Sequence, residues 1–172
     1  SSQATPRRAV VGWDSGRLAM IMAVLEARCD LALGGTEVYL NVVGGLKITE
    51  PAADMAVAAA LISSVTGTPL PPETVVFGEV GLSGETRAVS QTDARLKEAE
   101  KLGFCRAIIP KSRLRKGRTE DKGKKAVGWD TSLIITEIDH LADLVSKFAN
   151  ADQKRRSDAE IRAGAEVTRT TG

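Results

Sequence analysis

Aromatic residues are scarce in this sequence of 172 residues. They make up only 3% of the chain, although hydrophobic residues of all kinds reach 42%. A core must therefore be filled mainly by Ala, Val, Leu and Ile, which pack closely and leave few large pockets. The length and the hydrophobic content fit one globular domain, with a tail.

Cysteine and histidine are also rare. The two cysteines, Cys29 and Cys105, do not form a Cys-x-x-Cys pair, which argues against a disulfide framework and against a zinc site. We expect both to be buried thiols in a protein of the reducing cytoplasm. The single histidine, His140, has no second histidine with which to share a metal ion, and a structural or solvated role is favoured over catalysis.

Long apolar runs and a strong net charge are absent as well. The longest apolar run, Leu18 to Leu25, is far shorter than the ~20 residues that a membrane-spanning helix needs, and no signal peptide is visible. We therefore expect a cytoplasmic protein without a membrane partner. The net charge of +2 does not by itself imply a nucleic-acid partner. Residues 1–6 (SSQATP) do not resemble an initiation region, so we expect a fragment of a longer protein.

The glycine patterns that hold nucleotide phosphates are missing. Neither Gly34–Gly35 nor Gly44–Gly45 fits Gly-x-x-x-x-Gly-Lys-Ser/Thr or Gly-x-Gly-x-x-Gly. The evenly spaced Gly78, Gly81 and Gly84 lie in a predicted hairpin, where turn geometry explains them. We do not expect this chain to bind ATP by itself.

Four helices are predicted from apolar residues at helical spacing. The first runs from about Ser15 to Arg28, the second opens at Pro51 and stops at Gly67, the third is capped by Thr92 or Asp93 and ends at Gly103, and the fourth is capped by Asp139 and carries an apolar stripe to Phe148. The second helix is apolar almost all round and is expected to be central and buried.

Strands are predicted between these helices, over residues 37–43, 74–80, 85–89, 105–109 and 133–138, with a hairpin turn at residues 82–84. The interleaving predicts an α/β (α+β layered) domain, a mixed sheet packed with helices. We assign this domain to residues 1–149. Residues 150–172 are polar and carry no sustained apolar stripe, and they are predicted to form a mobile tail.

Two carboxylates, Glu50 and Asp54, lie four residues apart where the second helix begins. Such a pair suits acid–base catalysis, but the positive end of the helix dipole also favours carboxylates there, by a few tenths to about 1 kcal/mol. The electrostatic explanation is the simpler one, and both stay open.

The stretch from Val42 to Pro110 resembles the proteolytic domain of the Lon family, above all at residues 61–69 (LISSVTGTP) and 78–85 (GEVGLSGE). Lon uses a Ser–Lys dyad. Its serine position, just after the proline that starts the Ala-rich helix, is Ala52 here, and its lysine position is Asp93. Alanine has no nucleophilic atom and aspartate cannot serve as a neutral amine base, so the resemblance implies a domain that is not an enzyme.

A relocated peptidase site is the alternative, with Ser63, Ser64 or Ser90 as the nucleophile and Lys97 as the base. Ser63 and Ser64 lie about three helical turns beyond Ala52, on the order of 15 Å along the helix axis. We therefore favour the domain without a catalytic pair.

A closer match covers the chain to about Ala149. It involves residues 6–12 (PRRAVVG), 17–20 (RLAM), 41–45 (NVVGG), 50–54 (EPAAD) and 75–85 (VVFGEVGLSGE). These segments resemble the C-terminal Lon-like domain of the RadA (Sms) family of bacterial DNA repair and recombination proteins. In that family a four-cysteine zinc finger and a RecA-like ATPase precede this domain, and neither is present here. The resemblance therefore implies that zinc, ATP and Mg²⁺ belong to those other domains, and that this one needs no cofactor.

The resemblance also implies a function and partners. Proteins of this family form hexameric rings that use ATP to move on DNA and promote branch migration. We expect a non-catalytic scaffold domain that helps to assemble a homo-oligomer, a hexamer in the parent protein, and contacts single-stranded or branched DNA. A module that recruits another protein is a further alternative.

A basic segment, Lys111–Lys125, departs from the shorter loop that the resemblance leads us to expect. It contains eight basic and two acidic residues. It is either a contact for DNA phosphates or a solvated insertion, and without an aromatic residue it would bind through charge alone. The candidate DNA-binding residues are Lys111, Arg113, Arg115, Lys116, Arg118, Lys122, Lys124 and Lys125.

Overall fold

The structure is a computed structural model, and it describes residues 5–112 and 128–170. Strands and helices alternate along most of the chain. In chain order the elements are β1 (Arg8–Val11), α1 (Ser15–Cys29), β2 (Val38–Asn41), the 3₁₀ turns η1 (Val43–Gly45) and η2 (Pro51–Ala53), α2 (Asp54–Thr66), β3 (Thr74–Val76), β4 (Glu79–Val80), β5 (Thr86–Arg87), α3 (Thr92–Lys101), β6 (Arg106–Pro110), β7 (Ile134–Ile138) and α4 (Leu141–Thr170).

The described strands form three small sheets. β1 and β2 pair in parallel, β3, β6 and β7 form a parallel sheet in that order, and β4 and β5 form an antiparallel hairpin. This confirms the predicted α/β class, with parallel and antiparallel pairing both present. The strands are divided among separate sheets because β4 and β5 turn away from the sheet that β3 begins.

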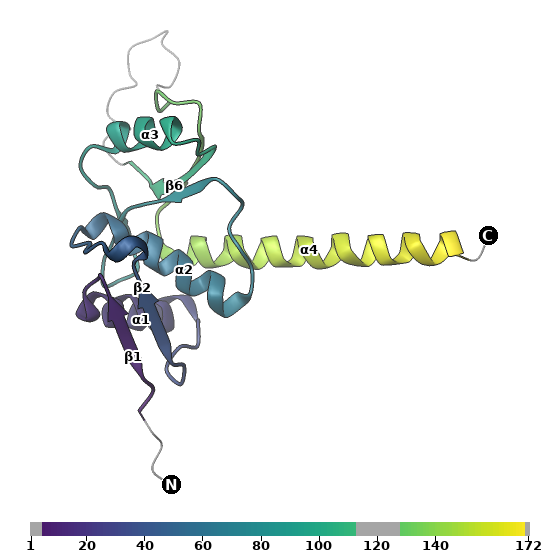
Figure 1. Ribbon diagram of the computed structural model, residues 1–172, viewed down its shortest axis with the longest axis horizontal. Coiled ribbons are helices and arrows are strands. Elements are labelled where there is room, and N and C mark those ends of the chain that lie inside the picture. The colour runs from purple at the N-terminus through teal and green to yellow at the C-terminus, as the bar shows by residue number, and fades with distance from the viewer. Residues whose placement is uncertain (1–4, 113–127, 171–172) are drawn as a thin grey trace.

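Helix α2 lies at the centre of the domain. It contacts α1, α4, β3 and β4, and Figure 1 shows it between α1, which lies beside β1 and β2, and the part of the molecule that contains β6 and α3. Met55, Ala58 and Ile62 on this helix are fully buried. The prediction of a central, buried Ala-rich helix is therefore confirmed.

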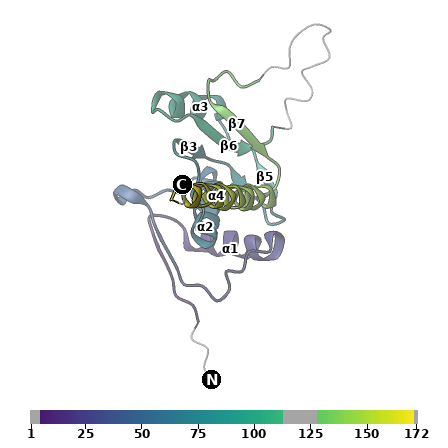
Figure 2. The same cartoon turned by 90° about the vertical axis from the view of Figure 1, so that its right-hand side faces the viewer.

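Side chains on opposite faces of the β3–β6–β7 sheet enter two different cores. Ile108 belongs to the main core with α1, α2 and α4, whereas Ala107 and Ile109 belong to a second core beneath α3. Successive residues of a strand point to opposite faces, so one short strand supports both cores. Figure 2 shows α3 and α4 on opposite sides of this sheet.

The predicted single strand over residues 74–80 is wrong, because the chain breaks at Gly78. Its N–H donates to the carbonyl of Ala52 at 2.8 Å, and its carbonyl accepts from the N–H of Met55 at 3.1 Å. Gly78 has φ +152°, and a Cβ there would overlap Met55 and Pro110. A close approach of backbone to α2, which requires glycine, therefore replaces the continuous strand.

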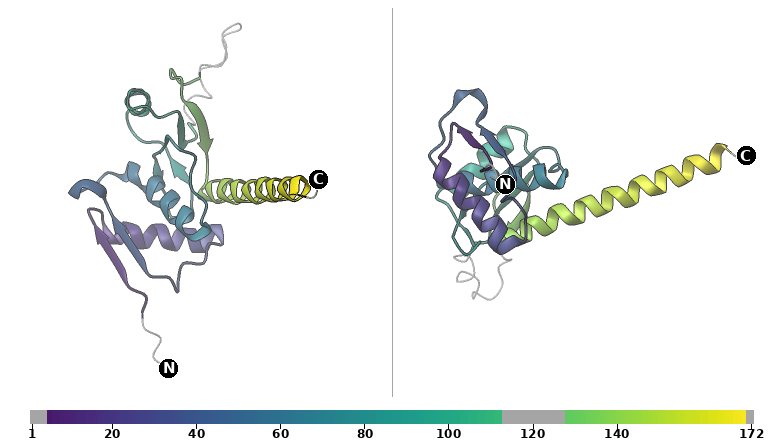
Figure 3. Two further views of the ribbon diagram at one scale, coloured as in Figure 1. Left: turned by 45° about the vertical axis from the view of Figure 1, so that its right-hand side comes forward. Right: turned by 90° about the horizontal axis from the view of Figure 1, so that it is seen from below.

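Two helix boundaries also differ from the prediction. The residue that precedes α3 is Gln91, in a left-handed conformation with φ +59°, and not Thr92 or Asp93. Helix α4 does not end near Phe148 but continues to Thr170, and its later turns extend away from the body (Figures 1 and 3). An Arg156–Asp152 ion pair of 2.8 Å, four residues apart, supports those turns. The mobility of residues 150–172 stays a prediction.

Across residues 5–112 and 128–170, no helix has both the length and the apolar character needed to cross a membrane.

The β4–β5 hairpin is docked onto the start of α4. The N–H of Leu141 donates to the carbonyl of Gly84 at 2.9 Å, and His140 Nε2 lies 2.8 Å from the carbonyl of Ser83. The N–H of Ala142 donates to His140 Nδ1 at 3.0 Å, so Nδ1 is an acceptor and Nε2 is the ring nitrogen that faces the Ser83 carbonyl. His140 therefore holds the hairpin to the helix, in line with the structural role favoured from the sequence.

We expect Gly84→Ala to destabilise the domain by more than Gly44→Ala. Both glycines have a positive φ, +87° and +80°, but a Cβ at Gly84 would overlap the His140 ring, whereas nothing lies within 4 Å of a Cβ at Gly44. The shared backbone cost is about 1–2 kcal/mol, and the overlap should add about 1–3 kcal/mol. Urea unfolding of the two variants measures the difference, and equal destabilisation would contradict the docking role of His140.

Candidate functional site

The two positions at which the Lon resemblance places a catalytic dyad lie on η2 and α3. Ala52 lies in η2 with 4% of its surface exposed, and its carbonyl accepts from Gly78 N–H. Asp93 lies in the first turn of α3 and is exposed. A methyl group and a carboxylate therefore occupy the positions of nucleophile and base, and neither performs the chemistry of a serine or a neutral lysine.

An arginine ties these two elements together. Arg95 on α3 forms an ion pair with Glu50, which directly precedes η2. Its Nε donates to the carbonyl of Ser90 at 3.0 Å, and its guanidinium lies 5.9 Å from the centre of the Phe77 ring. Because Glu50 and Arg95 are both partly exposed, the ion pair contributes about 1 kcal/mol or less. Its main effect is to orient α3 on η2.

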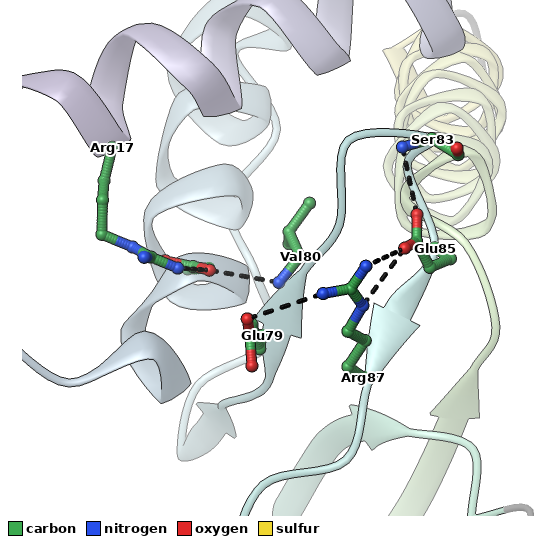
Figure 4. Close-up of polar contacts among 7 residues, drawn as sticks. Arg17, Glu79, Val80, Ser83, Glu85 and Arg87 are labelled. Atoms are coloured by element: carbon green, nitrogen blue, oxygen red, sulfur yellow. Dashed lines mark hydrogen bonds and ion pairs between the residues drawn. The ribbon is translucent and has the colours of Figure 1, made fainter.

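Asp54, which begins α2, is the most deeply buried charged side chain in the described part of the chain, with 0% exposure. It accepts hydrogen bonds from Arg17 Nε at 2.8 Å, from Arg17 Nη2 at 2.5 Å and from the N–H of Val80 at 3.1 Å. Figure 4 shows Arg17 of α1 and the Val80 amide approaching from different sides. The hydrogen bond to Asp54 raises the pKa of Arg17. These contacts join α1, α2 and β4.

The contacts of Glu50 and Asp54 decide between the two explanations of this pair. Each carboxylate has its own arginine, Arg95 for Glu50 and Arg17 for Asp54. A pair that serves as acid and base acts on one shared site, whereas these two carboxylates are directed at arginines of two different helices, α3 and α1. The structure therefore favours a structural, electrostatic role.

The β4–β5 hairpin contains a further arginine that is paired with carboxylates. Arg87 lies between Glu85, at 2.5 Å, and Glu79, at 3.8 Å (Figure 4). The hydrogen bond from Arg87 lowers the pKa of Glu85, and the charge of Glu79 adds to the rise in the pKa of Arg17. These ionic contacts thus brace the two strands of the hairpin against each other.

The residues of the alternative peptidase site do not form a dyad. Ser63 Oγ donates to the carbonyl of Thr68 at 2.9 Å, and Lys97 Nζ lies 3.3 Å from Asp130. Ser64 and Ser90 are exposed on α2 and on the loop before α3. The described contacts of Ser63 and Lys97 therefore lead away from each other.

The expectation of two buried thiols is wrong for Cys105. Cys29 is partly buried, and burial raises the pKa of its thiol, but Cys105 is exposed. Cys105 directly precedes β6, and its Sγ donates to Glu73 Oε2 at 3.0 Å. This hydrogen bond raises the pKa of the Cys105 thiol. Among the described residues, no group of three His, Cys, Asp or Glu side chains is arranged to hold a metal ion.

Only one of the eight candidate DNA-binding residues lies within the described part of the chain. Lys111 Nζ lies 3.1 Å from Asp139 Oδ2, so a carboxylate already partly neutralises its charge. Residues 113–127 lie outside the described residues. They include Arg113, Arg115, Lys116, Arg118, Lys122, Lys124 and Lys125.

We expect Asp54→Ala to destabilise the protein by about 3–5 kcal/mol, because it leaves the Arg17 guanidinium and the Val80 amide without their acceptor. The lower end is expected, since the Arg17 side chain is 30% exposed and solvent can partly replace the carboxylate. Glu50→Ala is the matched control and should cost about 1 kcal/mol or less. Chemical unfolding gives both values. Similar values for the two variants would show that Asp54 has no special role.

Comparison with curated proteins gives a consistent result, while no protein-family model matches the chain. The chain is 54% identical over 149 residues to a protein named DNA repair protein RadA from Brucella abortus (strain 2308), which covers 87% of this chain and 30% of that protein. Proteins of the same name from Rickettsia bellii (strain RML369-C) and Salmonella typhimurium (strain LT2) are 50% and 41% identical over 84% and 86% of the chain.

The match to these relatives lies in their C-terminal region. The chain spans about 30% of the length of the curated relatives it matches. This chain therefore belongs to the RadA family of DNA repair proteins and corresponds to the C-terminal region of those proteins.

Proposed function

We propose that this domain is a non-catalytic scaffold that holds subunits together and contacts DNA within a RadA-type, ATP-dependent repair and recombination protein that promotes branch migration. The relatives are DNA repair proteins by name, and a role in DNA repair follows from that family. The observation that carries the rest is the site around Ala52. The carboxylates that flank Ala52 in the sequence, Glu50 and Asp54, are each engaged in an ion pair with an arginine, which supports a structural role.

The non-catalytic part of the proposal is supported by the partners of these charged groups. Asp54, Glu50 and Glu85 are each bound by an arginine. A general base needs an accessible group within reach of the proton that it removes, and these carboxylates are already engaged by arginine side chains. We assign ATP, Mg²⁺ and Zn²⁺ to the part of the relatives that this chain does not span.

The outer face of the β1–β2 sheet supports the self-association part. Val10, Val38 and Leu40 pack against the main core, so the residues between them point outward. On that outer face Val11 is 58% exposed and Tyr39 is 62% exposed. Parallel sheets are normally covered on both faces, and here one face has no cover within the described residues.

The turn after β2 adds two more exposed apolar side chains next to this sheet in the sequence. Val43 is 83% exposed and Leu46 is 63% exposed. Contiguous exposed apolar patches of more than a few hundred Å² are uncommon on monomers and mark interaction sites. We therefore assign the outer face of β1–β2 with residues 43–46 as the subunit contact, part of a hexamer in the parent protein.

We expect Val43→Asp to weaken self-association of the chain, because a carboxylate would have to be desolvated in the contact. Leu102→Asp is the matched control. Leu102 is 69% exposed at the end of α3, on the part of the molecule opposite β1 (Figure 1). Sedimentation velocity over a range of concentrations measures the change. If both variants associate like the unchanged chain, the subunits meet along another surface.

DNA binding should depend on salt through the basic segment. We expect the joint replacement of Lys122, Lys124 and Lys125 by Ala to weaken binding to single-stranded DNA. The slope of log affinity against log salt should flatten by about 0.7 for each phosphate that the variant no longer neutralises. A control replaces Lys47, Lys101 and Lys154 by Ala and should leave the slope unchanged. Fluorescence anisotropy at low and high salt gives both slopes.

The scaffold proposal as a whole has a clear negative outcome. A chain that stays monomeric at every concentration and shows no salt-dependent DNA binding contradicts it. A relocated peptidase would instead cleave unfolded casein and react with a serine-directed probe, and neither result is compatible with the proposal.

A further inference from the structure

An apolar groove lies between helix α4 and the first residues of strands β3, β6 and β7. It encloses about 170 Å³. Ile108, Leu144 and Phe148 contribute buried side chains, and Pro69, Leu70 and Pro71 line it from the loop after α2. Figure 2, which looks along α4, shows this helix running below the β3–β6–β7 sheet.

The groove arises because α4 covers only part of the sheet. Thr74, Arg106 and Ile134 are the aligned first residues of the three strands. Leu144 and Phe148 are the last strongly buried residues of α4, and beyond them the helix leaves the body (Figure 3). The starts of the strands therefore stay uncovered on this face, and Ile134 is 63% exposed.

The walls of the groove resist collapse. Pro69 and Pro71 restrict the backbone of the loop after α2, and Thr74 Oγ1 donates to the carbonyl of Pro71 at 2.7 Å. On the other side the wall is a turn of α4 anchored in the core by Phe148, which is 2% exposed. The groove is thus formed by rigid elements before any ligand arrives, which lowers the entropic cost of binding.

Two cations and no acidic residue line the groove. They are Arg106 and Lys147. The hydrogen bond of Arg106 goes to a neutral group, the carbonyl of Pro72, at 3.4 Å. Within residues 5–112 and 128–160, neither cation has a carboxylate within ion-pair distance. The nearby carboxylate of Glu73 accepts from Cys105. An apolar cavity therefore opens beside two positive charges that have no carboxylate partner among the described side chains, residues 5–112 and 128–160.

We propose that this groove binds an acidic segment of a partner protein, which inserts one large apolar side chain and places carboxylates against Arg106 and Lys147. The size fits, because an apolar cavity of about 150 Å³ holds a benzene-sized group. Complementary charge next to an apolar anchor is the usual basis of specific recognition between proteins. The proposal does not depend on self-association or on DNA binding by the same chain.

Nucleic acid fits this groove less well. Bases of single strands stack on exposed aromatic rings, and the one aromatic residue that lines the groove, Phe148, is buried. Most of the lining is apolar and offers few partners for the polar edges of bases. The cations alone would attract phosphates, but the rest of the groove would stay unused.

The test uses the 172-residue chain and a fluorescein-labelled peptide, Gly-Asp-Asp-Leu-Phe-Asp-Asp-Gly. A second peptide of opposite charge has Lys in place of all four Asp residues. We expect the acidic peptide to bind with a Kd in the micromolar range, on the order of 10–100 μM for a contact of this size, and the lysine peptide to bind at least about tenfold more weakly. Fluorescence anisotropy measures both.

Charge reversal at Lys147 identifies the site. Lys147→Glu should lower the affinity for the acidic peptide at least about tenfold and raise the affinity for the lysine peptide. Lys154→Glu is the matched control: Lys154 lies two helical turns further along α4 and does not line the groove. It should change either affinity less than about twofold. If Lys154→Glu has the same effect as Lys147→Glu, the attraction is diffuse and the proposal fails.

The apolar anchor is tested separately. Ala151 lines the groove, so Ala151→Phe should narrow it and lower the affinity for the acidic peptide at least about tenfold. Ala149→Phe is the control, because Ala149 is an exposed residue of α4 that does not line the groove, and it should leave this affinity unchanged. Thermal unfolding checks that both variants stay folded. The proposal is overturned if the acidic peptide shows no binding at 1 mM, a concentration that corresponds to a binding free energy of about 4 kcal/mol in magnitude. It is also overturned if decanoate, an alkyl chain with a single carboxylate, binds more tightly than the peptide.

Discussion

The buried carboxylate of Asp54 is the constraint on which much of this domain depends. A charged group with no exposed surface needs close cationic or amide partners, and here they come from two other elements, Arg17 of α1 and Val80 of β4. Satisfying one carboxylate therefore sets how α1 and the hairpin lie against α2. Because α2 begins directly after η2, the same contacts also position Ala52.

Ion pairs also join the elements around Ala52. Glu50 and Arg95 join η2 to α3, and Arg87 braces the hairpin between Glu79 and Glu85. Ion pairs of this kind contribute little individually when they are exposed, but they orient elements that have little apolar contact with each other. The two proposals of function therefore rest on surfaces away from these ion pairs, the outer face of β1–β2 and the groove beside α4.

Most helices were predictable from the sequence because their buried faces repeat with the helical period. Leu18, Ile21 and Leu25 on α1 are fully buried as their spacing indicates. Short elements were harder. The four residues of β1 are too few to show a period, and the strand break at Gly78 depends on backbone contacts with Ala52 and Met55 that are distant in sequence. Cys105 was expected to be buried because its neighbours are apolar, yet it precedes the strand that they form.

The sequence by itself determined which side chains stand at residues 52 and 93, where the Lon resemblance places a serine and a lysine: a methyl group and a carboxylate, whatever the fold. It also determined the central Ala-rich helix and the family resemblance, because both lie in continuous segments. Only the tertiary structure decided which arginine each carboxylate meets, which sheet face stays uncovered, and that Arg106 and Lys147 flank one groove. Arg17 and Asp54 are 37 positions apart, and no local pattern encodes a contact that exists only once the helices have packed.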